Sequence, residues 1–333
     1  MKDAELSTRK AIELKPDFTK AINNLGALYL SSGKHDEAMN IYNKVFYLKS
    51  SKDEDEDIFK ANVYLMMSAL AKGDFAIIPS HINKGIQIIN NYAFKKENKL
   101  SKSFIKLIYS HKYIERIYSD LEKSENKNST KKIPHIGESH SLTFSQQTIK
   151  LFSEERKIQS IWIPNCKSWH FAKEEMNQYK ASFLEQYNRI NDSNEVLISF
   201  GEIDCRKTEG ILYHSIKYNK SIISICERTI NGYLNYMEKN LSKHYSKRFY
   251  FGVPAATRVK ELLDDLDIKR IKMIKLYNSI LKKEVLSRGS YFLDVYNLTS
   301  NKNGENNHIY MCDDTHLSPK CLSVLFENYL NKP

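Results

Sequence analysis

Short apolar runs alternate with helical spacing throughout the second half of the chain. The runs cover residues 133–136, 158–163, 196–200, 248–253 and 291–295. Between them, apolar residues recur at steps of three and four, as from Ile223 to Leu241 and again over about 267–287. Strands separated by helices form parallel sheets that are covered on both faces. We therefore expect an α/β fold, a three-layer α/β/α sandwich with about five parallel strands.

The first 120 residues show helical spacing and no strand-like run. Residues of one kind recur 34 positions apart, namely Ala4 and Ala38, Ala11 and Val45, Pro16 and Ser50. Gly26 is small enough to let two helices approach closely, and Gly33 can end a helix in the left-handed conformation. The pattern resembles the tetratricopeptide repeat, which implies antiparallel helices over 19–31 and 35–48 with Gly26 and Ala38 closest. A plain helical bundle is the alternative.

The rest of the helical part departs from this repeat. An acidic run over 53–57 interrupts the register, and a degenerate repeat with Gly73 at its turn follows. Helices over 80–91 and 100–120 are expected to cap the stack or dock it on the next domain, because repeats stabilise one another only by stacking. Residues 121–132 have few apolar side chains, as is typical of a linker. The expected division is a helical repeat domain over 1–120, a linker over 121–132 and an α/β domain over 133–333.

Composition is that of a globular protein. Hydrophobic residues make up 41% and charged residues 27% of a 333-residue chain, which suffices for two cores. Lys and Arg outnumber Asp and Glu by 51 to 40, a net charge of +11, but the lysines are dispersed and form no recognisable nucleic-acid module. The sequence has neither a membrane-spanning run nor the apolar segment of a signal peptide. We expect a cytoplasmic protein without a nucleic-acid partner or a membrane span.

The cysteines indicate neither a metal site nor a disulfide framework. They are odd in number and include no CxxC pair: Cys166, Cys205, Cys226, Cys312 and Cys321. This spacing is typical of free thiols in a reducing compartment and provides no set of zinc ligands. We expect no metal and no other cofactor.

A glycine, an acid and a serine follow the first predicted strand. A tight turn at Gly137-Glu138-Ser139 would lift the Ser139 hydroxyl above the sheet, near the N–H groups of the next helix. A serine that only caps this helix is the alternative. Gly201 follows the third predicted strand, and the carboxyl ends of parallel strands meet at one edge of a sheet. The two segments are therefore expected to lie together.

Three polar blocks are expected to converge at this edge. They are Gly137-Glu138-Ser139, Gly201-Glu202-Ile203-Asp204-Cys205-Arg206 and Asp313-Asp314-Thr315-His316. In this order over 133–330 they resemble the SGNH (GDSL) hydrolase superfamily, which has Gly-Asp-Ser, Gly-x-Asn-Asp and Asp-x-x-His blocks and a flavodoxin-like fold. The resemblance implies Ser139 as nucleophile, His316 as general base and Asp313 as the acid that orients it. The chemistry agrees, because a histidine activates a serine hydroxyl and a carboxylate holds the histidine tautomer.

Asp314 competes with Asp313 for the orienting role, since the spacing only mildly favours Asp313. The first block has Glu138 in place of the family's aspartate. No glycine occurs between Ser139 and Gly201, so the family's second-block glycine, a backbone donor to the oxyanion, has no counterpart. Asn165, after the second predicted strand, is our candidate for that donor.

The block after the third strand also departs from the family pattern. We match the family's oxyanion asparagine to Asp204, although a carboxylate cannot donate a hydrogen bond unless it is protonated. Arg206 is expected to neutralise Asp204 or to face the substrate, and Glu202 is a second possible partner of Arg206. Asp204, Glu202, Arg206 and Asn165 are therefore our candidates for oxyanion or substrate contacts.

Three functions follow from these patterns. The first is a serine esterase or O-acyltransferase, with acetyl the expected group, that acts on a small-molecule or glycan ester while the helical repeats recruit a protein partner. The second is a catalytically weak module that binds glycan or protein, motivated by Asp204 and the missing glycine. The third is a scaffold that works through its repeats. The joint presence of Ser139, Asp313 and His316 favours the enzyme.

Overall fold

The computed structural model describes residues 2–47, 54–95, 100–122, 131–152, 154–187, 193–241, 246–257 and 264–330. Its first part, which we call the helical region, comprises α1 (Lys2–Leu14), α2 (Thr19–Ser31), α3 (His35–Phe46), α4 (Asp55–Lys72), the 3₁₀ turn η1 (Phe75–Ile77), α5 (Ile78–Lys95) and α6 (Lys102–Glu122). As predicted, this part is helical in every described element. The predicted acidic run begins at Asp53, which lies outside the described residues, and its last three residues open α4.

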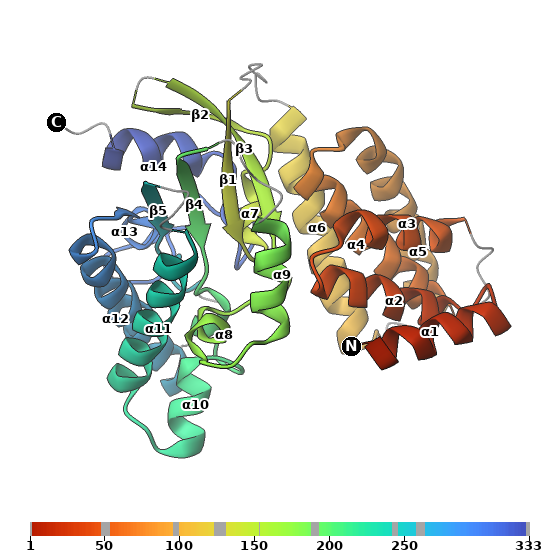
Figure 1. Ribbon diagram of the computed structural model, residues 1–333, viewed down its shortest axis with the longest axis horizontal. Helices are drawn as coiled ribbons and strands as arrows, with labels where there is room; N and C mark the ends of the chain where they lie inside the picture. The colour runs from red at the N-terminus through yellow and green to blue at the C-terminus, as the bar shows by residue number, and fades with distance from the viewer. Residues whose placement is uncertain are drawn as a thin grey trace.

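The second part is built on a six-stranded sheet with strand order β2-β3-β1-β4-β5-β6 (Figure 1). The strands are β1 (Lys132–Gly137), β2 (Thr148–Leu151), β3 (Glu154–Trp162), β4 (Glu195–Ser199), β5 (Lys247–Phe251) and β6 (Tyr291–Leu293). The connecting elements are α7 (His140–Thr143), α8 (Ser168–Ala172), α9 (Gln178–Tyr187), η2 (Ile203–Cys205), α10 (Ile211–Tyr218), α11 (Ile222–Leu241), α12 (Asp265–Ser287), α13 (Val295–Thr299) and α14 (Cys321–Leu330).

The predicted α/β fold class is confirmed, with one difference in the sheet. The five expected strands are parallel to their neighbours. The sixth, β2, was not expected, and it pairs antiparallel with the edge strand β3. It spans only four residues, and a run this short carries too little alternation to be recognised as a strand. Because it is an edge strand, it leaves the order of the parallel core unchanged.

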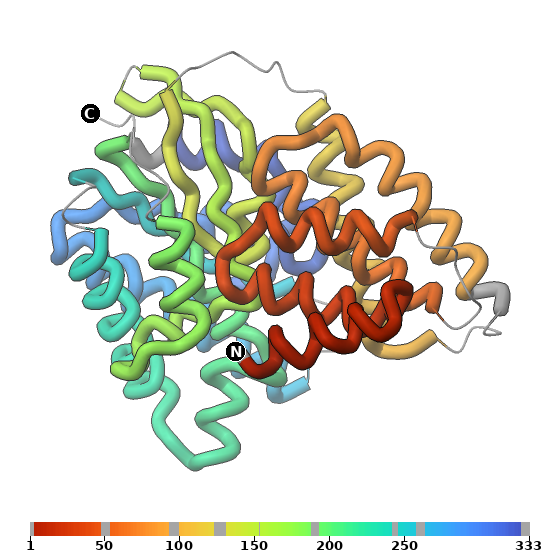
Figure 2. The backbone as a smooth tube through the Cα atoms, turned by 45° about the vertical axis from the view of Figure 1, so that its right-hand side comes forward, coloured from red at the N-terminus to blue at the C-terminus, as the bar shows by residue number. Residues whose placement is uncertain are grey.

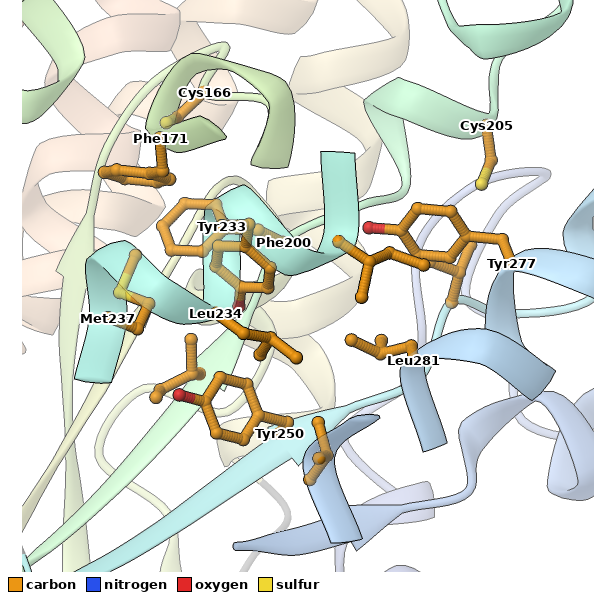
Figure 3. Packing of buried hydrophobic residues seen from close by; sticks show 14 of the residues in the cluster. Cys166, Phe171, Phe200, Cys205, Tyr233, Leu234, Met237, Tyr250, Tyr277 and Leu281 are labelled. Atoms are coloured by element: carbon orange, nitrogen blue, oxygen red, sulfur yellow. The ribbon is translucent and has the colours of Figure 1, made fainter. Parts of the chain in front are cut away.

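Side chains alternate along the parallel strands between two apolar layers. On β4, Val196 and Ile198 point to one layer and Leu197 to the other. The first layer packs under α11 and α12, where Tyr233, Tyr277 and their neighbours fill the space (Figure 3). The second layer packs under α14 (Figure 1). This burial on both faces explains the continuous apolar runs in the sequence, since each face of a parallel sheet must be covered.

The helix pair that motivated the repeat prediction is present, with a different close contact. Helices α2 and α3 are connected by a turn in which Gly33 has φ +76°, the left-handed conformation that was expected. The nearest neighbour of a side chain added at Gly26 is the ring of Tyr42, at 2.6 Å, rather than Ala38. This contact involves a side chain, so the prediction that Gly26 and Ala38 mark the closest approach of the two helices stays a prediction. Assignment to the tetratricopeptide class stays a prediction.

The helical region lies beside the α/β part (Figure 2) and shares a core with it. Leu142 of α7 and Trp162 of β3 belong to the same apolar cluster as the side chains of α2 to α6. The hydroxyl of Ser145 donates to the Leu70 carbonyl at 2.5 Å, which joins the two parts by a buried hydrogen bond. The division into domains stays a prediction, and residues 123–130 of the predicted linker lie outside the described residues.

Within the described ranges, no helix is long and apolar enough to cross a membrane. All five cysteines are free thiols, as the sequence predicted. Across the same ranges, no three or more His, Cys, Asp or Glu side chains gather in an arrangement that could hold a metal ion.

Candidate active site

The turn after β1 presents Ser139 at the carboxyl edge of the sheet. Gly137 ends the strand where a Cβ would collide with the Ser199 hydroxyl of β4, so glycine is required by the close packing of the two strands. The chain then turns, and α7 begins at His140. Ser139 therefore stands between a strand end and a short helix, as the sequence predicted.

The side chains of Ser139, His316 and Asp313 form one hydrogen-bonded chain. Ser139 Oγ lies 2.9 Å from His316 Nε2, and His316 Nδ1 donates to Asp313 Oδ2 at 2.8 Å. The expected proximity is thus observed, and Asp313 rather than Asp314 bonds the histidine.

Asp313 is held in place by its own loop. Its Oδ1 accepts the backbone N–H groups of Thr315 at 2.7 Å and His316 at 2.6 Å. Burial alone would raise the pKa of Asp313, but the hydrogen bond and charge of His316 lower it to about 2. The carboxylate is therefore ionised at neutral pH and able to hold the proton on Nδ1.

Glu138 and His140 form a buried ion pair beside Ser139. Glu138 Oε1 accepts from His140 Nδ1 at 2.6 Å, while His140 Nε2 faces the Thr315 carbonyl at 3.2 Å. Since both acceptors need a proton on the ring, the geometry fits an imidazolium. Burial would lower the pKa of His140 and raise that of Glu138, but their attraction overrides burial and moves the two values to about 9 and about 2.

Glu138 also accepts a hydrogen bond from the Ser139 hydroxyl. The distance from Ser139 Oγ to Glu138 Oε2 is 2.8 Å. The hydroxyl has one proton, so Glu138 and His316 are alternative acceptors for it. Glu138, which stands where the resemblance implies an aspartate, therefore bonds the Ser139 hydroxyl itself.

Asp204 does not face Ser139, which corrects the oxyanion or substrate role expected for it. Its side chain is buried, 2% exposed, and accepts the backbone N–H groups of Ser168 at 2.7 Å and Trp169 at 3.1 Å at the start of α8. Burial raises the pKa of Asp204 to about 6, although these hydrogen bonds act in the opposite direction. A helix start needs acceptors for its free N–H groups, and Asp204 supplies them.

Arg206 neutralises Glu202 rather than Asp204, the first partner expected for it. Its Nε donates to Glu202 Oε2 at 2.9 Å, and its Nη1 lies 3.2 Å from Glu209 Oε1. Although burial disfavours the charge, the field of Glu202 raises the pKa of Arg206 above its ordinary value. Of the pair, Arg206 lines the cleft described below, and Glu202 does not.

Asn165 occupies the loop after β3 in a conformation usually left to glycine. Its φ is +57°, and asparagine is among the few other residues that adopt this region readily. Asn165 thus adopts, in the loop where a glycine was sought, a conformation that glycine otherwise favours. Across the described ranges, the backbone N–H groups of Ser139 and Asn165 have no acceptor.

The spacing of the Gly-x-Asn-Asp block places its asparagine one residue before Asp204. Counting along Gly201-Glu202-Ile203-Asp204 matches that asparagine to Ile203 and the following aspartate to Asp204. Ile203 lines the same cleft as Ser139, whereas Asp204 is turned into the protein. The side chain at the position of that asparagine is therefore an isoleucine, which cannot donate a hydrogen bond, and the match to Asp204 stood one residue too late.

A cleft of about 1220 Å³ opens above Ser139 and is lined by both parts of the chain. One wall consists of side chains from α4 and α6, including Lys60, Tyr64 and Lys112. The other wall carries Asn165, Arg206 and the loop of His316. Sequence reasoning placed the site on the α/β part alone, because no motif in the helical region signals a role at Ser139.

The sequence matches no family model, and no curated protein matches it. Among solved structures, a chain from Streptococcus pneumonia provisionally named a platelet activating factor has a TM-score of 0.40 and 14% identity, covering 74% of this chain and 96% of that one. A catalytic mutant of Axe2, an acetylxylan esterase from Geobacillus stearothermophilus, has a TM-score of 0.40 and 10% identity, covering 63% and 98%.

Another Axe2 mutant, described as an acetyl-xylooligosaccharide esterase, has a TM-score of 0.39 and 12% identity over the same shares of the two chains, 63% and 98%. These similarities are distant. The activity of the present chain has to be inferred from its own side chains.

Proposed function

We propose that this protein is a serine esterase or O-acyltransferase. The observation that carries the proposal is the chain of hydrogen bonds from Ser139 through His316 to Asp313, with heavy-atom distances of 2.9 and 2.8 Å. These distances lie within the range that proton transfer requires. All three residues line an open cleft, where an ester can reach them.

In the first step, Ser139 Oγ attacks the ester carbonyl while His316 Nε2 takes the hydroxyl proton. The carbonyl bond opens to an oxyanion, which then expels the alkoxide of the substrate. His316 returns the proton to that leaving oxygen, so an acyl-serine and a free alcohol are formed. Water, or a hydroxyl of an acceptor, then attacks the acyl-serine while His316 takes its proton. The proton passes to Ser139 Oγ as the acyl group leaves the serine. Asp313 keeps Nδ1 protonated and stabilises the imidazolium that forms in each step.

The backbone N–H groups of Ser139 and Asn165 are the proposed oxyanion donors. Both lack an acceptor within the described residues, and both residues line the cleft. Preformed donors of this kind stabilise the developing charge without having to reorganise. Ile203 stands where a side-chain donor would complete the set, so the site is expected to have one donor fewer than the family pattern implies.

We further propose that the substrate is an acyl ester, with acetyl the expected group, of a carbohydrate or glycan. This class is what the SGNH resemblance implies. The cleft volume of about 1220 Å³ supports it, because that space exceeds what a short acyl ester fills. Recruitment of a protein partner by the helical region stays a prediction.

The experiment is covalent labelling of the full chain by a fluorophosphonate, followed by mass spectrometry of the adduct. We expect one adduct on Ser139, none in Ser139→Ala, and an unchanged melting curve for that variant. A wild-type protein that folds but takes no label at any pH would contradict the proposal. Reactive protein would then be screened on acetylated sugars, with and without an alcohol acceptor, to separate hydrolysis from transfer.

A second candidate is a glycan-binding or protein-binding module with weak catalysis or none. Ile203 and the hydrogen bond from Ser139 to Glu138 favour it, because the first removes a donor and the second offers the serine proton another acceptor. The labelling rate separates the two candidates. Binding of acetylated oligosaccharides by a protein that cannot be labelled would support the module.

A further inference from the structure

One face of helix α6 lies against the loop that carries His316. The contacting residues are Tyr113, Arg116 and Asp120, whose spacing of three and four places them on one side of a helix. Arg116 donates to the Cys312 carbonyl, one residue before Asp313. Asp120 accepts from the Ser318 hydroxyl at 3.3 Å. The loop of the candidate base is thus bonded to the helical region before and after the histidine.

Tyr113 makes the most direct of these contacts. Its ring stacks on the ring of His316 with centroids 3.8 Å apart and planes 24° from parallel. Its hydroxyl donates to the Ser139 carbonyl at 2.7 Å and lies 2.8 Å from Thr143 Oγ1. The side chain is fully buried, and burial raises the pKa of Tyr113, so the hydroxyl keeps its proton and remains a donor.

The stacking restricts a motion of the His316 ring that its hydrogen bonds permit. Bonds at Nδ1 and Nε2 fix two points of the His316 ring, but the ring can still tilt about the line that joins them. A flat aromatic surface against one face prevents this tilt. The hydroxyl of the same tyrosine meanwhile fixes the backbone of Ser139. One residue of the helical region therefore sets the mutual position of both reacting groups.

We propose that Tyr113 is a positioning residue for Ser139 and His316, and that the helical region is consequently a structural part of the active site. This rests on the proposed function of Ser139 and His316. The role of Tyr113 is indirect, since it reaches the chemistry through the histidine ring and the serine backbone. Deletion of the helical region would on this account remove a component of the site as well as a wall of the cleft.

The test compares three variants of the full chain. Tyr113→Phe keeps the stacked ring and removes the hydroxyl, while Tyr113→Leu removes both. Phe104→Leu is the matched control, because Phe104 is equally buried on the same helix and packs on Phe59 and Tyr92 within the helical region. Melting curves of all three report loss of packing. The first readout is the pH profile of the fluorophosphonate reaction rate.

Apart from residue 113 itself, the titratable and polar groups that face the His316 ring influence this pH profile and are the same in every variant. They are Asp313 and Ser139 through hydrogen bonds, His140 at 5.4 Å between ring centroids, and Glu138 through its charge. The second readout, which needs no activity, is the ¹⁵N spectrum of the His316 ring nitrogens. It distinguishes a ring held in one orientation, which gives narrow signals, from a ring that moves between several orientations, which broadens them.

We expect Tyr113→Leu to react about 100-fold more slowly across the profile, the loss typical of a small misplacement of reacting groups. Tyr113→Phe should react roughly five-fold more slowly, as expected for one lost hydrogen bond, and should keep narrow ring signals. Phe104→Leu should match the melting change of Tyr113→Leu and react at the wild-type rate. In Tyr113→Leu the signals of the His316 ring should broaden, because the ring can tilt although Asp313 still holds the proton on Nδ1.

Wild-type rates in both Tyr113 variants would overturn the inference, as would equal slowing in Phe104→Leu. If the wild type takes no label, the proposed function fails, and the spectrum alone decides the role of Tyr113. Broadened ring signals in Tyr113→Leu then support positioning, and an unchanged spectrum overturns it. If Tyr113→Leu does not fold, Tyr113→Phe decides through the same rate: slowing supports the inference, and no slowing overturns it.

Discussion

The rings of Tyr113 and His316 lie 3.8 Å apart, centroid to centroid, although one residue belongs to helix α6 and the other to the loop before α14. Each of the two residues hydrogen-bonds Ser139 in the turn after β1. The tyrosine hydroxyl donates to the Ser139 carbonyl, and the histidine faces Ser139 Oγ. Three segments distant in the chain therefore meet at one serine. Stability of the helical region and reactivity of Ser139 are expected to be coupled for this reason.

Replacing Asp313 by Asn should slow the labelling of Ser139 by about 10²–10⁴-fold. The amide would offer a donor to His316 Nδ1 and favour the wrong tautomer. Asp314→Asn is the comparison, because Asp314 is exposed and adjacent, and its effect should be much smaller. The measurement is the second-order labelling rate at neutral pH. Equal losses in the two variants would contradict the assignment of the orienting acid.

Replacing Ile203 by Asn should raise the labelling rate by about 10-fold or more, because one oxyanion donor is worth ~10²–10³ in rate. The residue lines the cleft beside Ser139 and has an apolar side chain that cannot donate. Ile203→Leu serves as control, since it alters shape without adding a donor, and should leave the rate at or below that of the wild type. A folded Ile203→Asn protein with no gain would mean that position 203 does not reach the oxyanion.

Asp204→Asn should destabilise the fold and leave turnover without improvement. The carboxylate accepts two backbone N–H groups at the start of α8, and an amide would turn its own N–H₂ toward one of them. We expect a loss of roughly 1–3 kcal/mol in the free energy of unfolding, measured by urea denaturation. Faster turnover with full stability would instead restore an oxyanion role for Asp204.

The pair of Glu138 and His140 should make the protein less stable as pH rises above neutrality. The folded state keeps the His140 proton up to about pH 9, whereas an unfolded chain releases it near the ordinary value of 6.5. The stabilisation that the charged His140 contributes is therefore complete below pH 6.5. It is lost as the pH rises through about 9, by on the order of 1–3 kcal/mol. On the acidic side, Glu138 contributes above its ordinary 4.5, and this contribution is lost toward pH 2.

The measurement for this pair is the free energy of unfolding against pH in wild type and His140→Gln. The variant should be less stable at pH 6.5 and should lack most of the alkaline slope. A wild-type curve that is flat between 6.5 and 9 would show that the histidine is not charged in the fold.

Gly26→Leu should lower the free energy of unfolding by roughly 1–3 kcal/mol through overpacking. Even a Cβ at this position would lie 2.6 Å from the Tyr42 ring, so the α2–α3 contact has no room for a side chain. Asn24→Leu, on the exposed side of the same helix, is the matched control and should be nearly neutral. Equal stability of both variants would show that the two helices can separate without cost.

Local patterns predicted much of this molecule. Strands buried on both faces must be apolar throughout, and the helices that cover them must step by three and four, so the runs around Ile136 and Ile198 located the sheet. The spacing between Asp313 and His316 is also a local property, because a carboxylate three residues away can turn back to the ring. The position of Ser139 followed from the turn after a strand.

Tertiary structure decided what depends on distant neighbours or on backbone conformation. The sequence named Asn165 as a candidate donor, but only the structure showed its positive φ, and Asp204 proved to bond a helix start that lies 35 and 36 positions away. In the sequence, Tyr113 has the helical spacing of an ordinary core residue, and nothing distinguishes it from one. Its place on His316 follows only from the packing of α6 against the histidine loop, since a stacking contact between remote segments leaves no periodic trace in the chain.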